Sequence, residues 1–445
     1  MQVSLTKTGW MCSLRPWVSA LEPLLTYRRR EGDFAPGRQR KRATYVTERI
    51  FEVSGDVGAF PAGMLPRVVR RLKELGYTVD VSGTVHEFPV PDFNAVEQLR
   101  PGQEELLLSV AAHEGGLLVG GTGTGKGFII RQIARMYQQL RIVVISPRRS
   151  VVRQLYEDLD RSLLPGAVGL ITGEKKIRTD ARVVVTTVKS MPASPLQQAD
   201  IILFDEVHGV GQNQASEYLA YAHDARRFGF TASPVRGDGT GIVMEAMFGP
   251  VLAEIPYDEA VRDGLVVPLE VHMLPIGGSV PERKLPVANK RWSYWRNRYR
   301  NQVIAQTASM LPDDEQVLIM VETLEHARNL HDLLPEYALV HYSMPGKDLD
   351  KMRHEFAAGT LRRVIATTTW KEGVDFPQLS ILIRADGAPG EVSSTQIPGR
   401  LSRISAGKDV GVLIDFQDEF NEWATRRSQQ RVSIYRRKAW EVHVT

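Results

Sequence analysis

From about residue 95 onward, short apolar runs alternate with helical stretches, and this alternation restricts the possible fold more than any other feature. Runs this apolar are typical of strands that are buried on both faces of a parallel sheet covered by helices. A segment from about 255 to 300 divides the runs into two series, which predicts an α/β protein with two similar domains and a cleft between them. The expected strands are Leu117–Val119, Ile142–Ser146, Val183–Thr187, Ile201–Phe204 and Phe228–Thr231, then Val317–Val321, Ala338–Tyr342, Val364–Thr367, Ile381–Arg384 and Val410–Phe416.

A separate small α+β domain is expected before these series. Leu65–Leu75 has the apolar spacing of a helix, and Val46–Val53 and Tyr77–Val81 have strand character. A Pro-containing stretch, Phe88–Asp92, reads as a linker to the first parallel-sheet domain. The last domain is expected to carry its own linker at the start and a basic tail at the end. The predicted domain ranges are 1–90, 91–255 and 256–445.

The composition is that of an ordinary globular enzyme, with 43% hydrophobic and 24% charged residues. No apolar run approaches the roughly 20 residues of a membrane span, and no apolar signal core follows the N-terminus. Cys12 is the only cysteine, which excludes an internal disulfide and a cysteine-based metal cluster. These features predict a cytoplasmic protein that does not bind membranes.

The basic charge is concentrated at the start of the chain. Residues 1–90 hold 14 Lys and Arg against 9 Asp and Glu, although the net charge of the whole chain is only +4. The densest clusters are Arg28–Arg30 and Arg38–Arg42. Clustered basic residues attract phosphate backbones through counterion release. A solvated Arg-rich loop is the alternative, so this feature alone leaves nucleic-acid binding open.

A glycine-rich loop links the expected strand at Leu117–Val119 to a helix, and it has the pattern of a phosphate-binding loop. Glycines let the backbone amides surround a phosphate, and Lys126 adds a positive charge for the β- and γ-phosphates. The next residue is usually a Ser or Thr that binds Mg²⁺, but here it is Gly127. Either Thr122 or Thr124 compensates, or water fills the metal position. The loop residues predicted to bind the nucleotide are Gly121, Thr122, Gly123, Thr124, Gly125, Lys126 and Gly127.

Paired carboxylates follow the strand Ile201–Phe204 in the sequence Asp205-Glu206-Val207-His208. Metal-assisted phosphoryl transfer needs such a pair. Asp205 is predicted to hold Mg²⁺, and Glu206 is predicted to orient and deprotonate the attacking water. The sequence therefore predicts an ATP-hydrolysing site.

Asp205–His208 resembles the DExH box of superfamily 2 helicases, and further motifs of that superfamily occur in the expected order. Leu99–Gln103 resembles the adenine-reading element, which implies that Arg100 and Gln103 bind the nucleotide. Ser146–Ser150 and Thr186–Thr187 resemble the two motifs that hold the nucleic-acid backbone. The implied contacts come from Pro147, Arg148, Arg149 and Thr187. Gly229–Pro234 resembles the motif that couples hydrolysis to strand movement, with implied roles for Thr231, Ala232 and Ser233.

Two motifs of the second series complete the resemblance. Ala366–Asp375 resembles the motif that touches both substrates, with implied nucleic-acid contacts from Thr367 and Thr368 and nucleotide contacts from Gly373 and Asp375. Gln396–Arg403 resembles the arginine-finger motif, in which Gln396 couples hydrolysis to movement, although Ile397 replaces a usual basic residue. Arg400 and Arg403 are three apart, so on a helix they share a face and both could reach a γ-phosphate bound to the other domain.

The resemblance, which covers about residues 95–420, implies two tandem RecA-like domains, ATP and Mg²⁺ as cofactors, and forked, branched or partly single-stranded DNA as substrate. The overall plan resembles bacteriophage branched-DNA helicases of the UvsW type and, more distantly, RecG. By that resemblance a monomer in the host cytoplasm is expected, with single-strand-binding or recombination proteins as partners. An RNA helicase, a translocase without strand separation, and a DNA-binding scaffold that has lost turnover are the alternatives.

Three more segments are candidates for substrate contact. Lys290–Arg300 interleaves basic and aromatic residues, which suits phosphate contact with base stacking. Its alternative is a helix with aromatic residues in the core and arginines in water. Asp386–Glu391 is a Gly/Pro turn where helicases can carry a strand-separating element. The tail from Arg426 to Lys438 reads as a basic helix on DNA or as a solvated terminus.

Overall fold

The computed structural model describes most of the chain. The described residues are 1–31, 44–83, 88–121, 123–190, 193–207, 222, 224–232, 241–367, 370, 376–390, 394–395 and 398–444. The chain divides into two compact units, which are described separately. Unit 1 comprises Met1–Gly121 and Gly125–Ile255, and unit 2 comprises Thr122–Thr124 and Pro256–Thr445.

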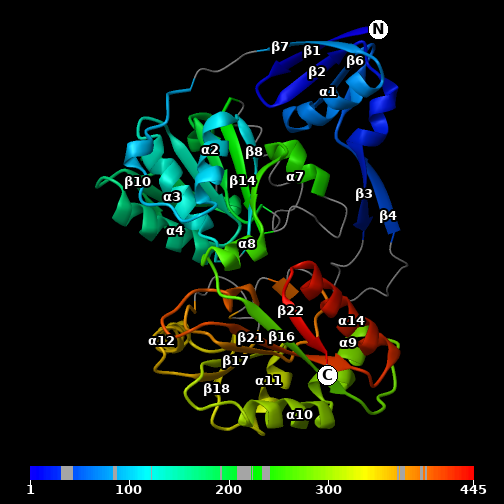
Figure 1. Cartoon of the computed structure of the whole chain (residues 1–445), viewed down its shortest axis with the longest axis vertical. Coiled ribbons are helices and arrows are strands. Elements are labelled where there is room, and N and C mark those ends of the chain that lie inside the picture. Colours follow the sequence, from blue (N-terminus) through cyan, green and yellow to red (C-terminus); the bar gives the residue numbers. More distant parts are fainter. Residues whose placement is uncertain are drawn as a thin grey trace. The chain divides into compact units, whose positions relative to one another are not determined.

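Unit 1 begins with a five-stranded sheet in the order β5-β6-β2-β1-β7, against which one amphipathic helix packs (Figure 1). β1 pairs parallel with β7, and the other pairings are antiparallel. The strands and helices of this N-terminal module are β1 (Gln2–Thr8), β2 (Met11–Arg15), η1 (Ser19–Leu25), β5 (Glu52–Ser54), β6 (Val57–Pro61), η2 (Ala62–Met64), α1 (Leu65–Glu74) and β7 (Thr78–Gly83). A separate antiparallel ribbon, β3 (Thr26–Glu31) with β4 (Thr44–Arg49), carries the Arg28–Arg30 cluster.

The second sheet of unit 1 has eight strands in the order β11-β10-β12-β9-β13-β14-β8-β15, and β11 alone runs antiparallel. Its strands are β8 (Gly115–Gly120), β9 (Ile142–Ser146), β10 (Val168–Ile171), β11 (Lys176–Ile177), β12 (Val183–Thr187), β13 (Ile201–Phe204), β14 (Arg226–Thr231) and β15 (Val251–Ile255). The helical elements around it are η3 (Phe93–Ala95), α2 (Gln103–Ala112), α3 (Lys126–Met136), α4 (Arg149–Ser162), η4 (Val188–Ser190), α5 (Ala193–Gln197) and α7 (Gly241–Phe248). All five strands predicted for this region are present.

The N-terminal module packs directly against α7. Ala246 of α7 is buried in the core of the module, beside residues such as Leu5 and Phe60. Gly63 lies so close to α7 that a Cβ at this position would stand 2.1 Å from the carbonyl oxygen of Glu245. Arg67 Nε also donates to Glu245 Oε1 over 3.0 Å. The module has its own sheet, but α7, which lies beside the second sheet of unit 1, supplies part of its core.

Unit 2 contains an entirely parallel sheet of seven strands in the order β18-β19-β17-β20-β21-β16-β22. Its strands are β16 (Leu269–Ile276), β17 (Val317–Met320), β18 (Ala338–Val340), β19 (Arg363–Ala366), β20 (Ile381–Arg384), β21 (Gly411–Asp418) and β22 (Glu441–Val444). Its helical elements are α8 (Tyr257–Arg262), α9 (Pro286–Lys290), the π-helix η6 (Arg291–Trp295), α10 (Arg298–Ser309), α11 (Leu324–His331), α12 (Gly346–Ala357), η8 (Pro398–Arg400) and α14 (Glu422–Arg437). The five strands predicted for this half are present.

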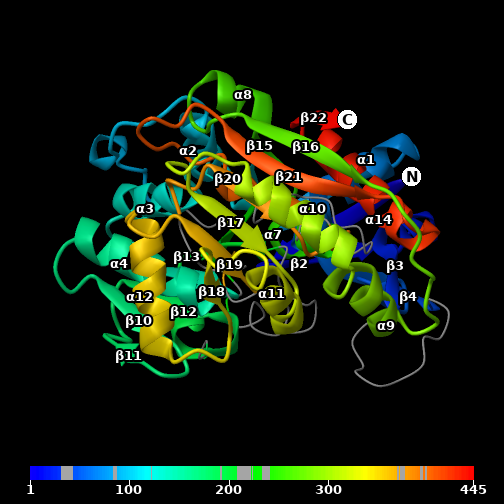
Figure 2. The ribbon, with the colours of Figure 1, turned by 90° about the horizontal axis from the view of Figure 1, so that it is seen from below.

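Both faces of the central strand β17 are buried, as its apolar run predicts. Val317 and Ile319 of β17 lie in one core cluster with side chains of α10 and α11, while Leu318 and Met320 lie in another with Phe356 of α12. Seen from below, α10 lies over β17 and β21 (Figure 2). Among the described residues, no helix is both long and apolar enough to span a membrane.

The tail forms the predicted helix and is not a solvated terminus, while its contact with DNA stays a prediction. Residues 422–437 form α14, whose Arg431 is fully buried, and the following β22 extends the sheet beside β16. Arg431 Nε donates to Asp415 Oδ2 over 2.8 Å, so this arginine neither faces DNA nor solvent. The segment packs into unit 2 because the buried carboxylates of Asp415 and Asp418 on β21 pair with the guanidinium charge of Arg431.

Candidate active site

Five of the predicted motifs follow five neighbouring parallel strands of unit 1. Because parallel strands end at the same edge of a sheet, the loops after β12, β9, β13, β14 and β8 all lie at its carboxyl edge, where ligands bind in open α/β sheets. In that order these loops and strand ends carry Thr187, Pro147 to Arg149, Asp205 with Glu206, Thr231 with Ala232, and the phosphate loop.

The phosphate loop has the backbone that its glycines allow. Gly123 and Gly125 adopt φ values of 93° and 89°, in the left-handed region that favours glycine, and α3 begins directly afterwards at Lys126. Lys126 Nζ donates to the carbonyl oxygens of Gly120, over 3.0 Å, and Gly121, over 3.2 Å. The ammonium group is therefore held over the loop that it is predicted to serve.

The structure brings Gln103 against this loop. The Gln103 side chain is buried at the start of α2, and its Oε1 accepts a hydrogen bond from the backbone N–H of Arg100 over 3.0 Å. A Cβ added at Gly125 would stand 2.7 Å from Gln103 Nε2. Glycine at 125 therefore lets the predicted adenine-reading residue contact the predicted phosphate-binding loop.

Asp205 is buried at the end of β13, and burial raises the pKa of its carboxyl to about 7. The negative charge of Glu206 adds to this rise, whereas the positive charges of Lys126 and Arg148 oppose it. Lys126 and Asp205 are thus electrostatically coupled within one site, as the motifs predict. The charge of Arg148, which was predicted from resemblance to contact nucleic acid, thus also acts on Asp205.

Glu206 adopts a left-handed backbone conformation with φ of 55°. This conformation is uncommon for a residue other than glycine and costs free energy, and such strain concentrates at functional sites. The turn lies directly after β13, between the ends of β9 and β14. The predicted base therefore occupies a strained position at the carboxyl edge.

The residues at this edge fit a Mg²⁺ ion. Asp205 Oδ1 is buried and has no hydrogen-bond partner within the described part of the chain, so this hard carboxylate oxygen can accept a metal. At Gly127, a Cβ would meet only Leu155 Cδ2, at an ordinary contact distance of 3.5 Å. Space therefore does not explain why the usual metal-binding hydroxyl is missing there.

The other predicted contacts of unit 1 vary in exposure. Thr187 is buried, and its hydroxyl donates to Ser190 Oγ over 2.9 Å. Arg149 is exposed and forms an ion pair with Glu174. Thr231 is fully buried at the end of β14.

Six predicted site residues lie outside the described residues, namely Thr122, Ser233, Thr368, Gly373, Asp375 and Gln396.

In unit 2, residues 398–400 of the arginine-finger motif form a short 3₁₀ turn, and the described part of the motif contains no α-helix. The turn ends at Arg400, and Arg403 follows it, so the prediction of a shared helix face is wrong. Arg400 Nη1 donates to the carbonyl oxygen of Trp370 over 2.9 Å, and Thr367 is also buried. Burial lowers the pKa of Arg403 to about 10, which leaves the guanidinium charged near neutral pH.

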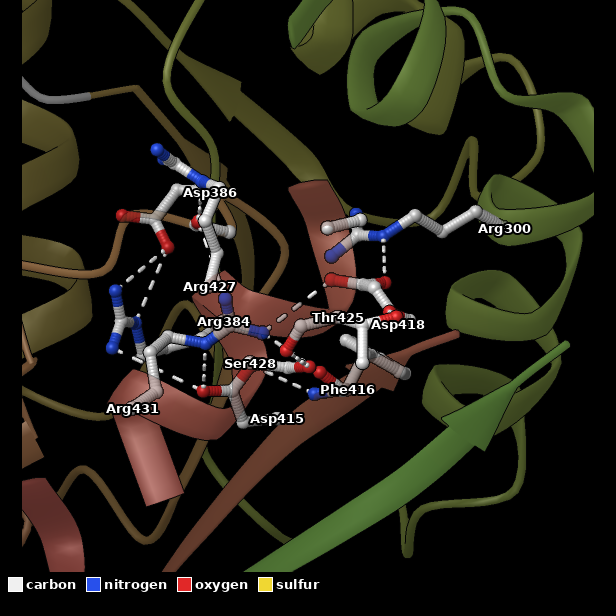
Figure 3. A network of polar contacts seen from close by, with 12 residues as sticks. Arg300, Arg384, Asp386, Asp415, Phe416, Asp418, Thr425, Arg427, Ser428 and Arg431 are labelled. Atoms are coloured by element: carbon white, nitrogen blue, oxygen red, sulfur yellow. Dashed lines mark hydrogen bonds and ion pairs between the residues drawn. The ribbon is translucent and has the colours of Figure 1, made fainter. Parts of the chain in front are cut away.

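A buried network of three arginines and three aspartates holds the predicted Asp386–Glu391 turn where it is described (Figure 3). Arg384 Nη2 donates to Asp386 Oδ1 over 3.1 Å, and Arg431 Nη1 donates to the carbonyl oxygen of Gly387 over 3.2 Å. Arg384 Nη1 also donates to Ser394 Oγ over 3.0 Å, shortly before the finger motif. Sequence reasoning missed this network because its members are far apart in the chain.

The Lys290–Arg300 segment is divided between core and surface. Tyr294 is fully buried, whereas Trp292 keeps 43% of its surface exposed. The expectation that the arginines stay in water is wrong for Arg300, which is fully buried and donates to Asp418 Oδ1 over 2.8 Å. A groove of 900 Å³ runs beside Trp292 and is lined by Arg291, Arg296, Arg298 and Arg328 among others.

Two family models match the chain, each over one half of the predicted motor. The model described as "Type III restriction enzyme, res subunit" matches residues 97–236, and the model described as "Helicase conserved C-terminal domain" matches residues 301–405. The chain belongs to the superfamily 2 helicases. The predicted membership is confirmed, while the DExH subtype and the likeness to RecG stay predictions.

The similar curated proteins include helicases of viruses and archaea. Putative helicase 22 of Sulfolobus islandicus filamentous virus is 23% identical over 240 residues, which are 49% of this chain and 42% of that protein. Probable helicase D10 of Escherichia phage T5 is 21% identical, and the match covers 80% of this chain and 78% of that protein. The DNA 3'-5' translocase XPB2 of Sulfurisphaera tokodaii is 20% identical, and the match covers 74% of this chain and 83% of that protein. The match thus spans less than half the length of the first of these relatives.

A solved RNA-bound protein shares the fold. The structure titled "S. cerevisiae Dbp5 bound to RNA and ADP BeF3" has a TM-score of 0.56 at 17% identity, with 78% of this chain and 90% of that chain covered. The crystal structure of T4 UvsW has a TM-score of 0.47 at 16% identity, with 100% and 99% covered. The predicted fold class, two RecA-like parallel-sheet domains with a small N-terminal α+β domain, is confirmed.

Proposed function

We propose that this helicase couples ATP hydrolysis to movement along DNA and that it unwinds or branch-migrates forked and junction DNA. The observation that carries the proposal is the convergence of Gln103, Lys126 and Asp205 at the carboxyl edge of one sheet, where Gln103 contacts Gly125 and the charge of Lys126 acts on Asp205. Adenine reading, phosphate binding and metal binding need those three residue types in one place.

Each residue has a separate role in the proposed hydrolysis. Lys126 and the loop amides bind the phosphates, and Gln103 fixes the adenine. Asp205 would hold Mg²⁺, which would supply positive charge to offset the charge of the phosphates. Glu206 orients a water molecule and removes its proton for attack on the γ-phosphorus. The leaving ADP and the phosphate then dissociate.

The second unit completes the proposed cycle. Arg400 and Arg403 contact the γ-phosphate only when the two units close around ATP, and they stabilise the charge of the transition state. Hydrolysis removes those contacts and the units part. Because both halves carry predicted nucleic-acid contacts, including Arg149 and Thr367, alternate closing and opening moves the strand. Thr231, Ala232, Ser233 and Gln396 are assigned to the coupling.

DNA is the proposed substrate for two reasons. The motif Leu99–Gln103 and the Gly229–Pro234 segment resemble those of DNA translocases more than those of RNA helicases. Relatives over most of this chain are named as a DNA 3'-5' translocase and as a putative DNA 3'-5' helicase. The name of the former also supports translocation without strand separation, which is the second candidate.

Two sets of measurements separate these readings. Mg²⁺-dependent ATP hydrolysis with DNA and with RNA tests the substrate class, and stimulation by RNA alone would reject DNA. Unwinding of a plain overhang, a fork and a four-way junction tests the geometry, with the fork and junction expected to be processed fastest. Stimulation by DNA without unwinding of any of the three would favour the simple translocase. No hydrolysis with either nucleic acid would support a scaffold.

The N-terminal module is proposed to bind the duplex part of the junction through the ribbon β3–β4. A two-stranded ribbon fits a duplex groove, and Arg28–Arg30 supply charge for the phosphates. Deleting residues 1–90 would test this poorly, because the deletion would uncover Ala246 of α7. Replacing Arg28–Arg30 with Gln should weaken fork binding and reduce its salt dependence while basal hydrolysis persists. Unchanged fork affinity would reject this role.

Trp292 is proposed to stack against a base of the single strand. It is the exposed aromatic residue of a groove whose arginines suit a phosphate backbone, and stacking is worth about 1–3 kcal/mol per base. Trp292→Ala should weaken single-strand binding about tenfold. Replacement of Tyr342, an exposed aromatic residue of the same unit, with Ala is the matched control. Equal affinities of the Trp292→Ala variant and the wild type would exclude stacking.

A further inference from the structure

Two acidic residues and two histidines form a four-membered array on the edge strands of unit 2. β22 pairs parallel with β16 in a register that places Glu441 opposite Glu270 and His443 opposite His272. Residues two apart on a strand face the same side of a sheet, and directly paired residues share that side. The four side chains therefore occupy one face, at the end of the sheet order.

The other face of the same strands is occupied by the hydrophobic core. Val271 and Met273 of β16 are buried in a core cluster, and Val442 of β22 packs against it. The side chains of Glu270, His272 and His443 are in contrast 38%, 39% and 42% exposed. The array is thus anchored from behind by apolar packing and is open to solvent in front.

The spacing of the donor atoms suits a metal ion. One ligating atom from each of Glu270, His272 and His443 lies within 4.8 Å of the others, and the two imidazole rings stack with centroids 4.9 Å apart. His272 Nε2 lies 3.5 Å from Glu270 Oε2, and His443 Nε2 lies 3.3 Å from Glu441 Oε1. Bonds of about 2.0–2.1 Å in a tetrahedral arrangement separate neighbouring donors by about 3.4 Å. The two imidazole–carboxylate distances of 3.5 and 3.3 Å match this spacing, and donors at the 4.8 Å limit would move together by about 1.4 Å on binding.

We propose that His272, His443 and Glu270 bind a divalent transition-metal ion of the zinc class, with Glu441 as the fourth ligand. Imidazole nitrogens combined with carboxylate oxygens favour Zn²⁺ over Mg²⁺, which prefers oxygen ligands alone. The ligands come from two strands, so the ion cross-links β22 to β16. β22 has only four residues and lies at the edge of the sheet, so the cross-link fixes the strand that follows α14.

This site is independent of the proposed ATP site. Its ligands belong to unit 2 and differ from Asp205, the proposed Mg²⁺ ligand of unit 1. Failure of the zinc site would leave the proposed hydrolysis untouched, and failure of hydrolysis would leave the zinc site untouched. Metal binding and ATP turnover are therefore measured separately.

Calorimetric titration of the metal-free full chain with Zn²⁺ alone tests the proposal. His443→Ala and His272→Ala should each lower the affinity by about tenfold or more, because each removes a ligand. His354→Ala removes an exposed histidine of α12 and should bind Zn²⁺ like the wild type, as should Asp205→Asn. Zn²⁺ affinity that is unchanged in both His443→Ala and His272→Ala would overturn the site.

Hydrogen exchange adds a readout that locates the ion. Zn²⁺ should slow amide exchange of residues 441–444 in the wild type and in His354→Ala, but not in His443→Ala. If His443→Ala loosens β22 without metal, Glu270→Gln, which keeps both histidines and the shape of the side chain, takes its place. Zn²⁺ binding that gives residues 441–444 no protection in the wild type would overturn the cross-link.

Discussion

At the scale of single residues, Gly127 is the main departure from the chemistry that the site otherwise fits. The loop, the lysine and the two carboxylates are in place, but the position that normally supplies a hydroxyl to Mg²⁺ carries no side chain. The surroundings would accept one, since a Cβ would touch only Leu155. Crowding by neighbouring side chains therefore does not account for the missing hydroxyl at position 127.

Gly127→Ser is therefore expected to improve Mg²⁺ binding. The added hydroxyl can reach the metal position and should lower the Mg²⁺ concentration for half-maximal ATP hydrolysis severalfold, by about 1 kcal/mol of binding free energy. Gly277→Ser, where a Cβ would meet nothing within 4 Å, is the control and should behave as the wild type. A Mg²⁺ requirement that rises or stays the same in Gly127→Ser would contradict the assignment.

His326 of α11 illustrates how burial makes a residue sensitive to acid. Its Nε2 lies 3.1 Å from Asn301 Oδ1, whereas its Nδ1 has no hydrogen-bond partner among the described residues. Burial lowers the pKa of His326 well below its usual value, and the nearby charge of Arg300 adds to this effect. The unfolded chain therefore takes up a proton near pH 6.5 that the folded chain does not.

His326→Gln should reduce the loss of stability in acid. The wild type loses stability as the pH falls below about 6.5, with a slope of up to about 1.4 kcal/mol per pH unit from this residue, and the variant lacks that contribution. Glutamine keeps an amide donor for Asn301. Thermal unfolding between pH 7 and pH 5 measures the difference, with the exposed His354→Gln as the control. Parallel pH profiles of His326→Gln and the wild type would refute this account.

At the scale of elements, strands that are apolar throughout could be predicted from the sequence, whereas short, alternating or glycine-containing strands could not. Ile142–Ser146, Val183–Thr187 and Ile201–Phe204 have the predicted bounds because strands buried on both faces are apolar throughout. β22 was missed because its sequence Glu-Val-His-Val alternates and is short. β10, which contains a glycine, was missed as well.

The same contrast holds for the candidate site. Motifs at strand ends could be brought together from the sequence, since the carboxyl ends of parallel strands share an edge. The burial of Arg300 and Arg431 could not be predicted from the sequence, because their shared partner Asp418 lies 118 residues from Arg300 and 13 residues from Arg431. Charged residues are expected at the surface unless such a partner is known. The arginine network in Figure 3 therefore emerges only from the tertiary structure.

Gly63→Ala should disturb the packing of the N-terminal module against α7. The new Cβ would stand 2.1 Å from the carbonyl oxygen of Glu245 and 2.7 Å from that of Ala246, and backbone atoms cannot move aside cheaply. Overpacking of this kind costs about 1–3 kcal/mol, so Tm should fall. Gly277→Ala, which adds a methyl group in open space, is the control. An unchanged Tm of Gly63→Ala would show that the module does not pack against α7 as described.

At the scale of the whole molecule, the chain combines a superfamily 2 helicase motor with an N-terminal module that packs against its first half. The residues proposed to hydrolyse ATP lie at one sheet edge of unit 1, while the proposed finger arginines belong to unit 2. In the proposed mechanism this division lets a chemical step drive movement, because the finger arginines would reach the phosphate only in a closed state. Glu206 links that chemistry to the proposed function, since it alone is assigned to remove the proton.

The most direct measurement is ATP hydrolysis by the wild type and by Glu206→Gln in the presence of forked DNA and Mg²⁺, with ATP affinity measured in parallel. The account predicts that the wild type hydrolyses ATP and that Glu206→Gln is slower by about 100-fold or more, while its ATP affinity stays within a few-fold. Hydrolysis by Glu206→Gln at the rate of the wild type, or no hydrolysis by the wild type on any DNA, would contradict it.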